Sequence, residues 1–373
     1  MTYSIGLGIF WISNETDNLI CEIEAMNQLS RRAFLRMLAV GTGALTLEQF
    51  LAACGRKPTS AVAPTSPLSP LPTATAGEAG KVVEPGPVTT PPAGVSETPS
   101  VLPPGVPDLV VARGSDPETI VRRALAAFGG IEKFVPKGAS VIIKPNICVA
   151  YHTYEYAATT NPWVVGALVK SCLEAGARHV QVMDFPFGGT PKEAYAKSGI
   201  GEQVEAAGGE MVYMSALKFT SADIPQGIDL KKTNIFSDVM KADVLIDVPI
   251  AKNHSLAGLT LGMKNLMGLI RDRSSIHANM GQRLADLTSL FRPTLTVVDA
   301  VRILVANGPT GGNLNDVKKM DTVIVSPDIV AADSYATSLF GLRPEDIAYI
   351  PAAAAMGLGH SDLQNLKIEE ITA

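Results

Sequence analysis

The densest group of functional side chains lies between Lys252 and Gly268, in the run Lys-Asn-His-Ser-Leu-Ala-Gly-Leu-Thr-Leu-Gly-Met-Lys-Asn-Leu-Met-Gly. Lys264 and Asn265 have apolar residues and glycines as neighbours instead of other charges, so we expect their side chains to point into a cleft. Two lysines and His254 meeting there would form a cationic pocket suited to a carboxylate or a phosphate. The alternative is a surface helix whose lysines extend over apolar contacts.

A glycine-rich segment over residues 307–313, Asn-Gly-Pro-Thr-Gly-Gly-Asn, is a second candidate for anion binding. Its backbone N–H groups could cradle an anion, which makes Asn307 and Gly308 candidate binding residues. The segment fits a long turn equally well, because it contains neither GxGxxG nor GxxxxGK[ST].

Two aspartates in the run Ser-Pro-Asp-Ile-Val-Ala-Ala-Asp-Ser form a third candidate. Asp328 follows a predicted strand and either binds a ligand or caps the helix that begins there. Asp333 lies among apolar residues, so we expect its carboxylate to face a partner such as Lys264 or a ligand.

His254, Asp184 and Asp299 are the candidates for moving a proton. Together they could also assemble a mixed nitrogen and oxygen metal site. Neither HxH nor HExxH is present, so the metal stays unknown. We expect the other histidines to be structural or exposed: His152, His179, His277 and His360. No GxSxG follows a strand, which argues against a Ser–His–Asp hydrolase.

The cysteines restrict the cofactors. Only Cys148 and Cys172 fall in the predicted folded part, with no CxxC and no CxxCH. This spacing excludes a four-thiolate iron–sulfur cluster or a c-type haem held by this chain alone. The two could pair as a disulfide in an oxidising compartment, but we expect two buried free thiols. The cofactor stays unknown.

Apolar runs that alternate with helical stretches must position these residues. Predicted strands cover Leu109–Ala112, Val141–Ile143, Val180–Met183, Met211–Met214, Val244–Val248, Leu295–Val298 and Thr322–Val325. A capping side chain before a proline starts a helix at Asp116-Pro117, Asn161-Pro162 and Thr190-Pro191, and a further helix covers Ile200–Ala207. The pattern predicts an α/β fold, with a mostly parallel sheet covered by helices on both faces.

Ligands of such a sheet bind outside the carboxyl ends of its strands. Five predicted strands run into polar residues: Lys144 and Asn146, Asp184, Lys252 and His254, Asp299, and Asp328. A single polar residue after a strand is usually a solvated loop residue, but the recurrence predicts that these side chains share one rim.

The amino-terminal part resembles a bacterial export signal. Arg31 and Arg32 precede a weakly apolar segment, and Leu-Ala-Ala-Cys, ending at Cys54, resembles a lipobox. The apolar run is too short to span a bilayer, which needs about 20 residues. We interpret residues 26–53 as a twin-arginine signal with a lipobox, and residues 1–25 as an artefact of an upstream translation start.

Residues 54–107 are predicted to be the lipidated cysteine and a disordered tether, because half of the 26 prolines lie in residues 55–107. Residues 108–373 are then one α/β domain, extracytoplasmic and held to the membrane by lipid on Cys54. The net charge of −5 and the lack of a basic stripe argue against nucleic acid as a partner.

These segments, in this order, resemble a family known only as domain of unknown function three-six-two. The resemblance runs from Ile143-Lys-Pro-Asn146 to the region 328–341, and its most specific parts are Lys252 through Gly268, Val298-Asp299 with Asn307-Gly308-Pro309, and Ser-Pro-Asp328 through Asp333. The family's frequent association with iron–sulfur proteins implies redox work and an exported redox partner. This chain lacks the cysteine-rich segments of such members.

Three functions fit these features. The first is an extracytoplasmic enzyme acting on an anionic small molecule, with Lys144, Asn146, Lys252, Lys264 and Asn265 binding it. The second is a solute-binding lipoprotein, and the third is an accessory subunit docking an exported redox complex. The enzyme is favoured, although the sequence names neither reaction nor substrate.

Overall fold

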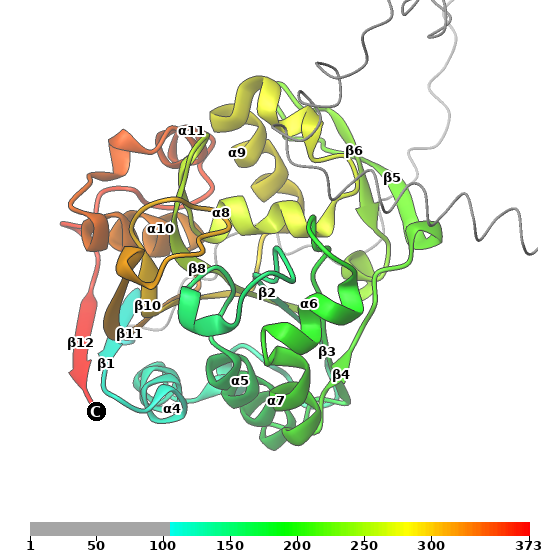
Figure 1. Ribbon diagram of the computed structural model, residues 1–373. Helices are drawn as coiled ribbons and strands as arrows, with labels where there is room; N and C mark the ends of the chain where they lie inside the picture. Colours follow the sequence, from blue (N-terminus) through cyan, green and yellow to red (C-terminus); the bar gives the residue numbers. More distant parts are fainter. Residues whose placement is uncertain (1–104) are drawn as a thin grey trace, which may run out of the picture. The chain divides into compact units, whose positions relative to one another are not determined.

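A ten-stranded, mostly parallel sheet forms the centre of the protein, whose computed structural model describes residues 105–373 (Figure 1). The main path runs β12-β1-β11-β10-β7-β2-β3-β4, while β8 pairs with β10 and β9 pairs with β8. Its strands are β1 (Leu109–Arg113), β2 (Ser140–Pro145), β3 (His179–Val182), β4 (Glu210–Met211), β7 (Val244–Val248), β8 (Ile250–His254), β9 (Gly258–Thr260), β10 (Leu295–Leu304), β11 (Val317–Ser326) and β12 (Ile368–Thr372). A separate antiparallel pair joins β5 (Phe219–Asp223) to β6 (Lys232–Phe236).

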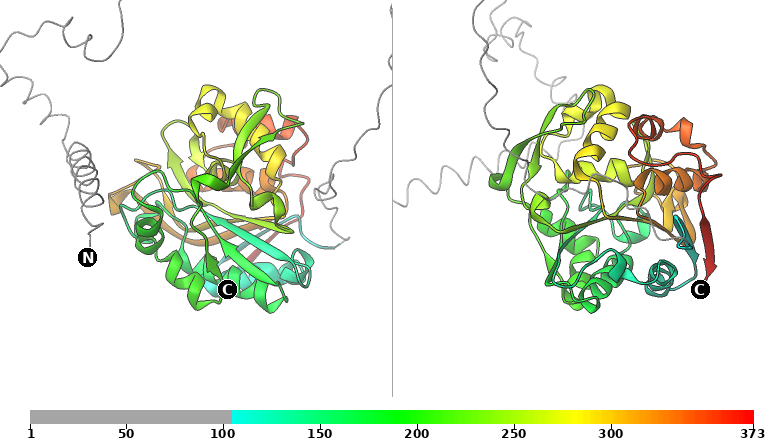
Figure 2. Two further views of the ribbon diagram at one scale, coloured as in Figure 1. Left: turned by 90° about the vertical axis from the view of Figure 1, so that its right-hand side faces the viewer. Right: turned by 180° about the vertical axis from the view of Figure 1, so that it is seen from behind.

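Helices cover both faces of the sheet. They are α4 (Pro117–Ala127), α5 (Pro162–Glu174), α6 (Pro191–Lys197), α7 (Ile200–Ala206), α8 (Gly262–Asn265), α9 (Met280–Phe291), α10 (Ile329–Thr337) and α11 (Tyr349–Ala355). One core packs α4, α5, α6 and α7 on one face, and a second packs α8, α9, α10 and α11 on the other (Figures 1 and 2). Adjacent strand residues divide between the cores, as Ile142 and Ile143 do, because successive side chains point to opposite faces.

The expected α/β fold with helices on both faces is therefore correct. The three helices that were predicted to begin at a proline are capped by Asp116, Asn161 and Thr190. Each cap accepts a backbone N–H of its helix. Both cysteines of the described part, Cys148 and Cys172, are free and buried, as expected.

The direction of β11 was not predicted. It runs antiparallel to both β1 and β10, so its carboxyl end lies at the opposite edge of the sheet from the ends of β2, β3 and β7. The strand that ends at Val248 was expected to give way to a loop. Instead Pro249 separates β7 from β8, so Lys252 and His254 lie within a strand that continues beside β10.

The predicted export signal and lipidation site, Arg31, Arg32 and Cys54, lie outside the described residues. Within residues 105–373, no helix is both long enough and apolar enough to cross a membrane.

Candidate functional site

A small cleft lies where β2 and β3 end, beside β8 and α8. Its volume is about 60 Å³. The lining side chains include four cations and one carboxylate: Lys144, Lys252, Lys264, Arg273 and Asp184. The other lining residues are Asn146, Cys148, Phe185, Phe187, His254, Thr260, Asn265, Met267, Gly268 and Pro309. Seven of the residues selected from the sequence thus meet in one place: Lys144, Asn146, Asp184, Lys252, His254, Lys264 and Asn265.

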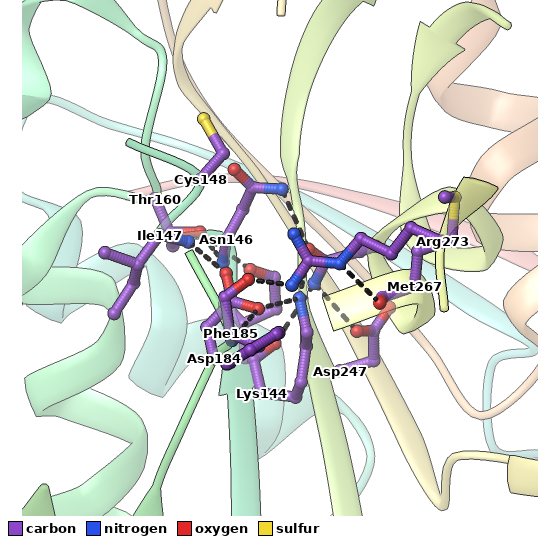
Figure 3. A network of polar contacts seen from close by, with 12 residues as sticks. Lys144, Asn146, Ile147, Cys148, Thr160, Asp184, Phe185, Asp247, Met267 and Arg273 are labelled. Carbon is purple, nitrogen blue, oxygen red and sulfur yellow. Dashed lines mark hydrogen bonds and ion pairs between the residues drawn. The ribbon is translucent and has the colours of Figure 1, made fainter. Parts of the chain in front are cut away.

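An ion pair between Lys144 and Asp184 forms the floor of this cleft (Figure 3). The Lys144 Nζ lies 3.0 Å from Asp184 Oδ1, and both side chains are buried. Asp184 also accepts the backbone N–H groups of Ile147 and Phe185, so its carboxylate is satisfied by the protein. Burial lowers the pKa of Lys144, against the opposing effect of Asp184. Asp184 is therefore held by Lys144 and two backbone donors, whereas the Lys144 amine contacts two acceptors, Asp184 and Asn265.

Asn265 links the ion pair to the strands beneath it. Its Oδ1 accepts from Lys144 Nζ at 2.7 Å and from Asn146 Nδ2 at 3.0 Å. Its Nδ2 donates to the Lys144 carbonyl and to Asp247 Oδ1. Burial holds the pKa of Asp247 well above its usual range. All four hydrogen-bonding positions of the Asn265 amide are occupied, which fixes the carboxyl end of α8 against β2.

Lys252 is fully engaged by the protein. Its Nζ lies 3.0 Å from Asn146 Oδ1, 2.6 Å from the Ala158 carbonyl and 2.9 Å from the Pro309 carbonyl. It also lies 3.2 Å from Cys148 Sγ. An ammonium has three protons, so Lys252 supplies charge to the cleft but has no donor left for a ligand.

Lys264 differs from Lys252 in its contacts. Within residues 105–373 its Nζ has neither a hydrogen-bond acceptor nor an ion-pair partner, although it lines the cleft. Burial, together with the charges of Lys252, Arg273 and Lys144, lowers the pKa of Lys264 to about 7. Lys264 is thus a half-buried lysine that is surrounded by cations and has no internal acceptor among the described residues.

His254 lines the cleft from β8. Its Nδ1 accepts the backbone N–H groups of Leu256 at 3.1 Å and Ala257 at 3.3 Å, so the neutral ring carries its proton on Nε2. Burial and the nearby Lys264 and Lys252 lower the pKa of His254 to about 3. At neutral pH it can donate a hydrogen bond from Nε2, but it has no lone pair free to accept a proton.

Arg273 was not selected from the sequence, although it lines the cleft. Its guanidinium lies over the Phe185 ring at 5.1 Å and donates to the carbonyls of Met267 and Phe185. Burial lowers its pKa. The Asp-Arg-Ser-Ser surroundings of Arg273 are typical of a solvated loop. Cys148 was likewise interpreted only as a buried thiol. Its proximity to Lys252 depends on the strand pairing and has no local signal.

Two aspartates expected at the site are held elsewhere by backbone N–H groups. Asp299 lies within β10, not at its end, and accepts from Asn161 and Val301. Asp333 was expected to face Lys264 or a ligand. Instead its two oxygens accept from Gly262 and Met263, at the start of α8. Burial raises the pKa of each carboxyl to about 7.

The expectation of one shared rim is wrong for Asp328, because β11 is antiparallel and ends at the other edge. Asp328 caps α10 by accepting from Ala331, and it contacts His360 at 2.8 Å.

The glycine-rich segment around Asn307 adopts a turn that internal hydrogen bonds hold in place. Asn307 donates to Asp316, and the Gly308 N–H donates to Asn253 Oδ1. Only Pro309 of this segment lines the cleft.

His254, Asp184 and Asp299 do not assemble a ligand set. Over the described chain, no group of three or more His, Cys, Asp or Glu side chains is arranged to hold a metal ion.

Together, the sheet and its cleft define an α/β domain with a small cationic site at strand ends. The chain belongs to the family described as domain of unknown function (DUF362), whose family model matches residues 141–338. It is 26% identical over 253 residues to a thylakoid-associated protein of Synechocystis sp., a match that covers 64% of this chain and 74% of that protein.

Two solved structures are similar to parts of this chain. The lactate racemase apoprotein of Thermoanaerobacterium thermosaccharolyticum matches 64% of this chain with a TM-score of 0.42 and 14% identity. A protein of Thermotoga maritima solved in a structural genomics programme matches 61% of this chain with a TM-score of 0.37 and 11% identity. The chain spans 58% and 60% of the length of these two structures.

Proposed function

We propose that the cleft binds a small carboxylate or phosphate and that the protein is an enzyme acting on that anion. The observation that carries this proposal is Lys264, a half-buried lysine that lines the cleft without an acceptor for its amine among the described residues. Four cationic side chains face one carboxylate in the lining, and that carboxylate already pairs with Lys144. An entering anion would therefore meet uncompensated positive charge.

The donors for such an anion come from different elements. Lys264 lies on α8, His254 offers Nε2–H from β8, and Arg273 follows η5 (Leu266–Leu269). The volume of about 60 Å³ suits a reacting head group better than a large molecule. Partly buried donors that converge on one small volume favour a positioned reaction over loose surface binding.

Titration calorimetry with acetate and with inorganic phosphate tests the anion site. We expect saturable binding of at least one of them by the wild type and a tenfold to hundredfold weaker affinity in Lys264→Met. That range follows from about 1.5–3 kcal/mol for a hydrogen bond to a charged group. Lys170→Met is the matched control, because Lys170 is exposed on α5 and pairs only with Glu118. Equal affinity in all three proteins would contradict the proposal.

A non-catalytic solute-binding role, or docking to an exported redox complex, is the alternative use of the same site. Binding of an anion without turnover of any compound of its class would favour that alternative. Candidate compounds can be supplied as mixtures of carboxylates and phosphate esters and followed by mass spectrometry.

We also infer that the protein is exported folded and lipid-anchored through Cys54. The twin arginines Arg31 and Arg32 and the lipobox support this inference. Expression in a bacterium fed an alkyne fatty acid should label the wild type in the membrane fraction. Cys54→Ser should lose the label, and the double change of Arg31 and Arg32 to Lys should retain the unprocessed precursor. An unlabelled wild type would overturn the inference.

A further inference from the structure

We propose that the amine of Lys264 forms an imine with the carbonyl group of an oxo acid, which makes oxo acids the substrate class of this site. This inference rests on the proposed anion site and extends it from binding to covalent chemistry. It depends on the position of Lys264 and on the charges that surround it.

The amine is accessible to a ligand and held near neutrality. Lys264 lines the cleft, and no side chain or carbonyl of the described residues accepts from it. The side chains that face it are Lys144 from β2, Lys252 and His254 from β8, Arg273 and Cys148. Three of these are basic side chains, and their charges oppose a charge on the Lys264 amine. A desolvated lysine beside other cations is the arrangement that activates an amine as a nucleophile.

The charge of the cleft selects the carbonyl compound. Imine formation at neutral pH leaves a positively charged iminium among Lys144, Lys252 and Arg273. A neutral aldehyde or ketone would leave that charge uncompensated. An oxo acid brings its own carboxylate, which balances the iminium charge and can accept from Arg273 or from an ammonium nearby, so the adduct is neutral overall.

The step balances without a further reactant. The Lys264 nitrogen lone pair attacks the carbonyl carbon, and the carbonyl π electrons move to oxygen. A proton passes from nitrogen to that oxygen, which gives a carbinolamine. The nitrogen lone pair then expels the hydroxyl, which leaves as water with a proton from solvent, and a C=N bond remains. His254 can donate its Nε2–H to the oxygen throughout, because Nδ1 is occupied by backbone donors.

Reductive trapping tests the proposal on the full-length protein. The probe is pyruvate with sodium cyanoborohydride, followed by peptide mass spectrometry. We expect a reduced adduct on Lys264 that forms at least tenfold faster than any adduct on exposed lysines such as Lys170 and Lys367. Lys264→Arg should abolish it, while Lys170→Met should leave it unchanged. Addition of Cys148 to the carbonyl would give a hemithioketal, which the hydride does not fix.

Lactate separates this inference from the anion site itself, because it carries the carboxylate but no carbonyl. We expect lactate to bind, to form no adduct, and to slow trapping by pyruvate. Lactate or acetate binding that depends on Lys264, without a pyruvate adduct, overturns the imine and leaves the anion site standing. If neither lactate nor acetate binds and pyruvate forms no adduct, both the imine and the anion site are overturned. Equal labelling of many lysines also overturns the imine. The thermal midpoint of Lys264→Arg shows whether that variant is folded.

Discussion

Lys252 and Lys264 enter the same cleft with their ammonium groups in different environments. The first has four neighbouring acceptors, while the second has none among residues 105–373. Lys264 lacks, among the described residues, an internal acceptor that would stabilise its charged form, and burial lowers its pKa to about 7. The two residues are chemically the same, and the difference in role comes entirely from what their surroundings offer.

Anion affinity should depend on pH through Lys264. Its pKa of about 7 in the free protein means that binding of acetate, which favours the ammonium, takes up a proton above that pH. We expect the affinity to be constant well below pH 7 and to fall about tenfold per pH unit well above it. Lys264→Arg should bind acetate without this fall, because a guanidinium stays protonated. Calorimetry from pH 6 to pH 9 in two buffers measures the affinity and the proton uptake. A wild-type affinity that is flat across this range would contradict the assignment.

Gly268 is required by the ion pair on the cleft floor. A Cβ at this position would overlap Asp184 Oδ1 and lie 2.5 Å from Lys144 Nζ. We expect Gly268→Ala to lower the free energy of unfolding by about 1–3 kcal/mol, as overpacking of buried sites does, and to weaken anion binding. Gly201→Ala in α7 is the control, because its Cβ would meet only ordinary contacts from 3.4 Å outward. Urea unfolding checks both, and an unaffected Gly268→Ala would show that the pair can relax.

At the scale of elements, α8 is short and depends on a neighbour for its place. Asp333 of α10 accepts from Gly262 and Met263 at the start of α8, which carries Lys264 and Asn265. Asn265 then fixes the other end to β2. The position of the Lys264 amine is therefore set by contacts of α8 with α10 and β2, to which Asn265 of α8 contributes.

Asp333→Ala should affect both stability and the site. Loss of the acceptor leaves two backbone N–H groups buried, which costs about 1–3 kcal/mol for each unsatisfied group. We also expect anion affinity to fall at least tenfold, because Lys264 loses its fixed position. Asp116→Ala is the control. It removes the cap of α4, should cost about 1 kcal/mol, and should leave the affinity unchanged. A variant that loses stability but keeps full affinity would show that α8 holds its position without Asp333.

Local signals in the sequence were sufficient for many of the elements, but they missed β8, β9 and β12 and did not give the strand directions. The caps at Asp116, Asn161 and Thr190 act within one helical turn, so they could be recognised from neighbouring residues. The antiparallel course of β11 depends on pairing with β1 and β10, far away in the chain. The expectation that Asp328 shares the rim of the cleft failed for this reason, whereas its predicted alternative role as a helix cap is confirmed.

The residues of the candidate site likewise divide into those with a local signal in the sequence and those without one. Lys264 and Asn265 could be selected because their apolar neighbours made them unusual, whereas Arg273 has polar neighbours and looks like a surface residue. Asp333 was selected only because its apolar neighbours predicted burial. A buried carboxylate needs a partner, but burial does not tell whether that partner is a ligand or a backbone N–H.

At the scale of the whole molecule, Asp299 joins the central strand β10 to the start of α5. Burial raises its pKa to about 7, above its value of 3.8 in an unfolded chain. The folded state therefore holds the proton more tightly, and the resulting stability is complete below pH 3.8 and is lost as the pH rises through 7.

Asp299→Asn should flatten the pH dependence of unfolding. We expect the free energy of unfolding of the wild type to fall relative to that of the variant between pH 5 and pH 7, by up to about 1.4 kcal/mol per pH unit. Asp333 and His254 titrate in both proteins, so their contributions cancel in the difference. Chemical unfolding at closely spaced pH values measures this slope. A constant difference between the two proteins would mean that Asp299 stays ionised in the fold.

The strand order also determines at which edge of the sheet β1 begins, relative to the cleft. β1 runs parallel to β10, β7 and β2, because β11 reverses direction between β1 and β10. Its first residue, Leu109, therefore lies at the edge of the sheet opposite the strand ends that carry the cleft. A support coupled to the residues directly ahead of Leu109 would meet this edge first. A protein immobilised in this way on a sensor chip should keep its cleft facing the flowing solution, whereas coupling through lysines near the cleft should block it.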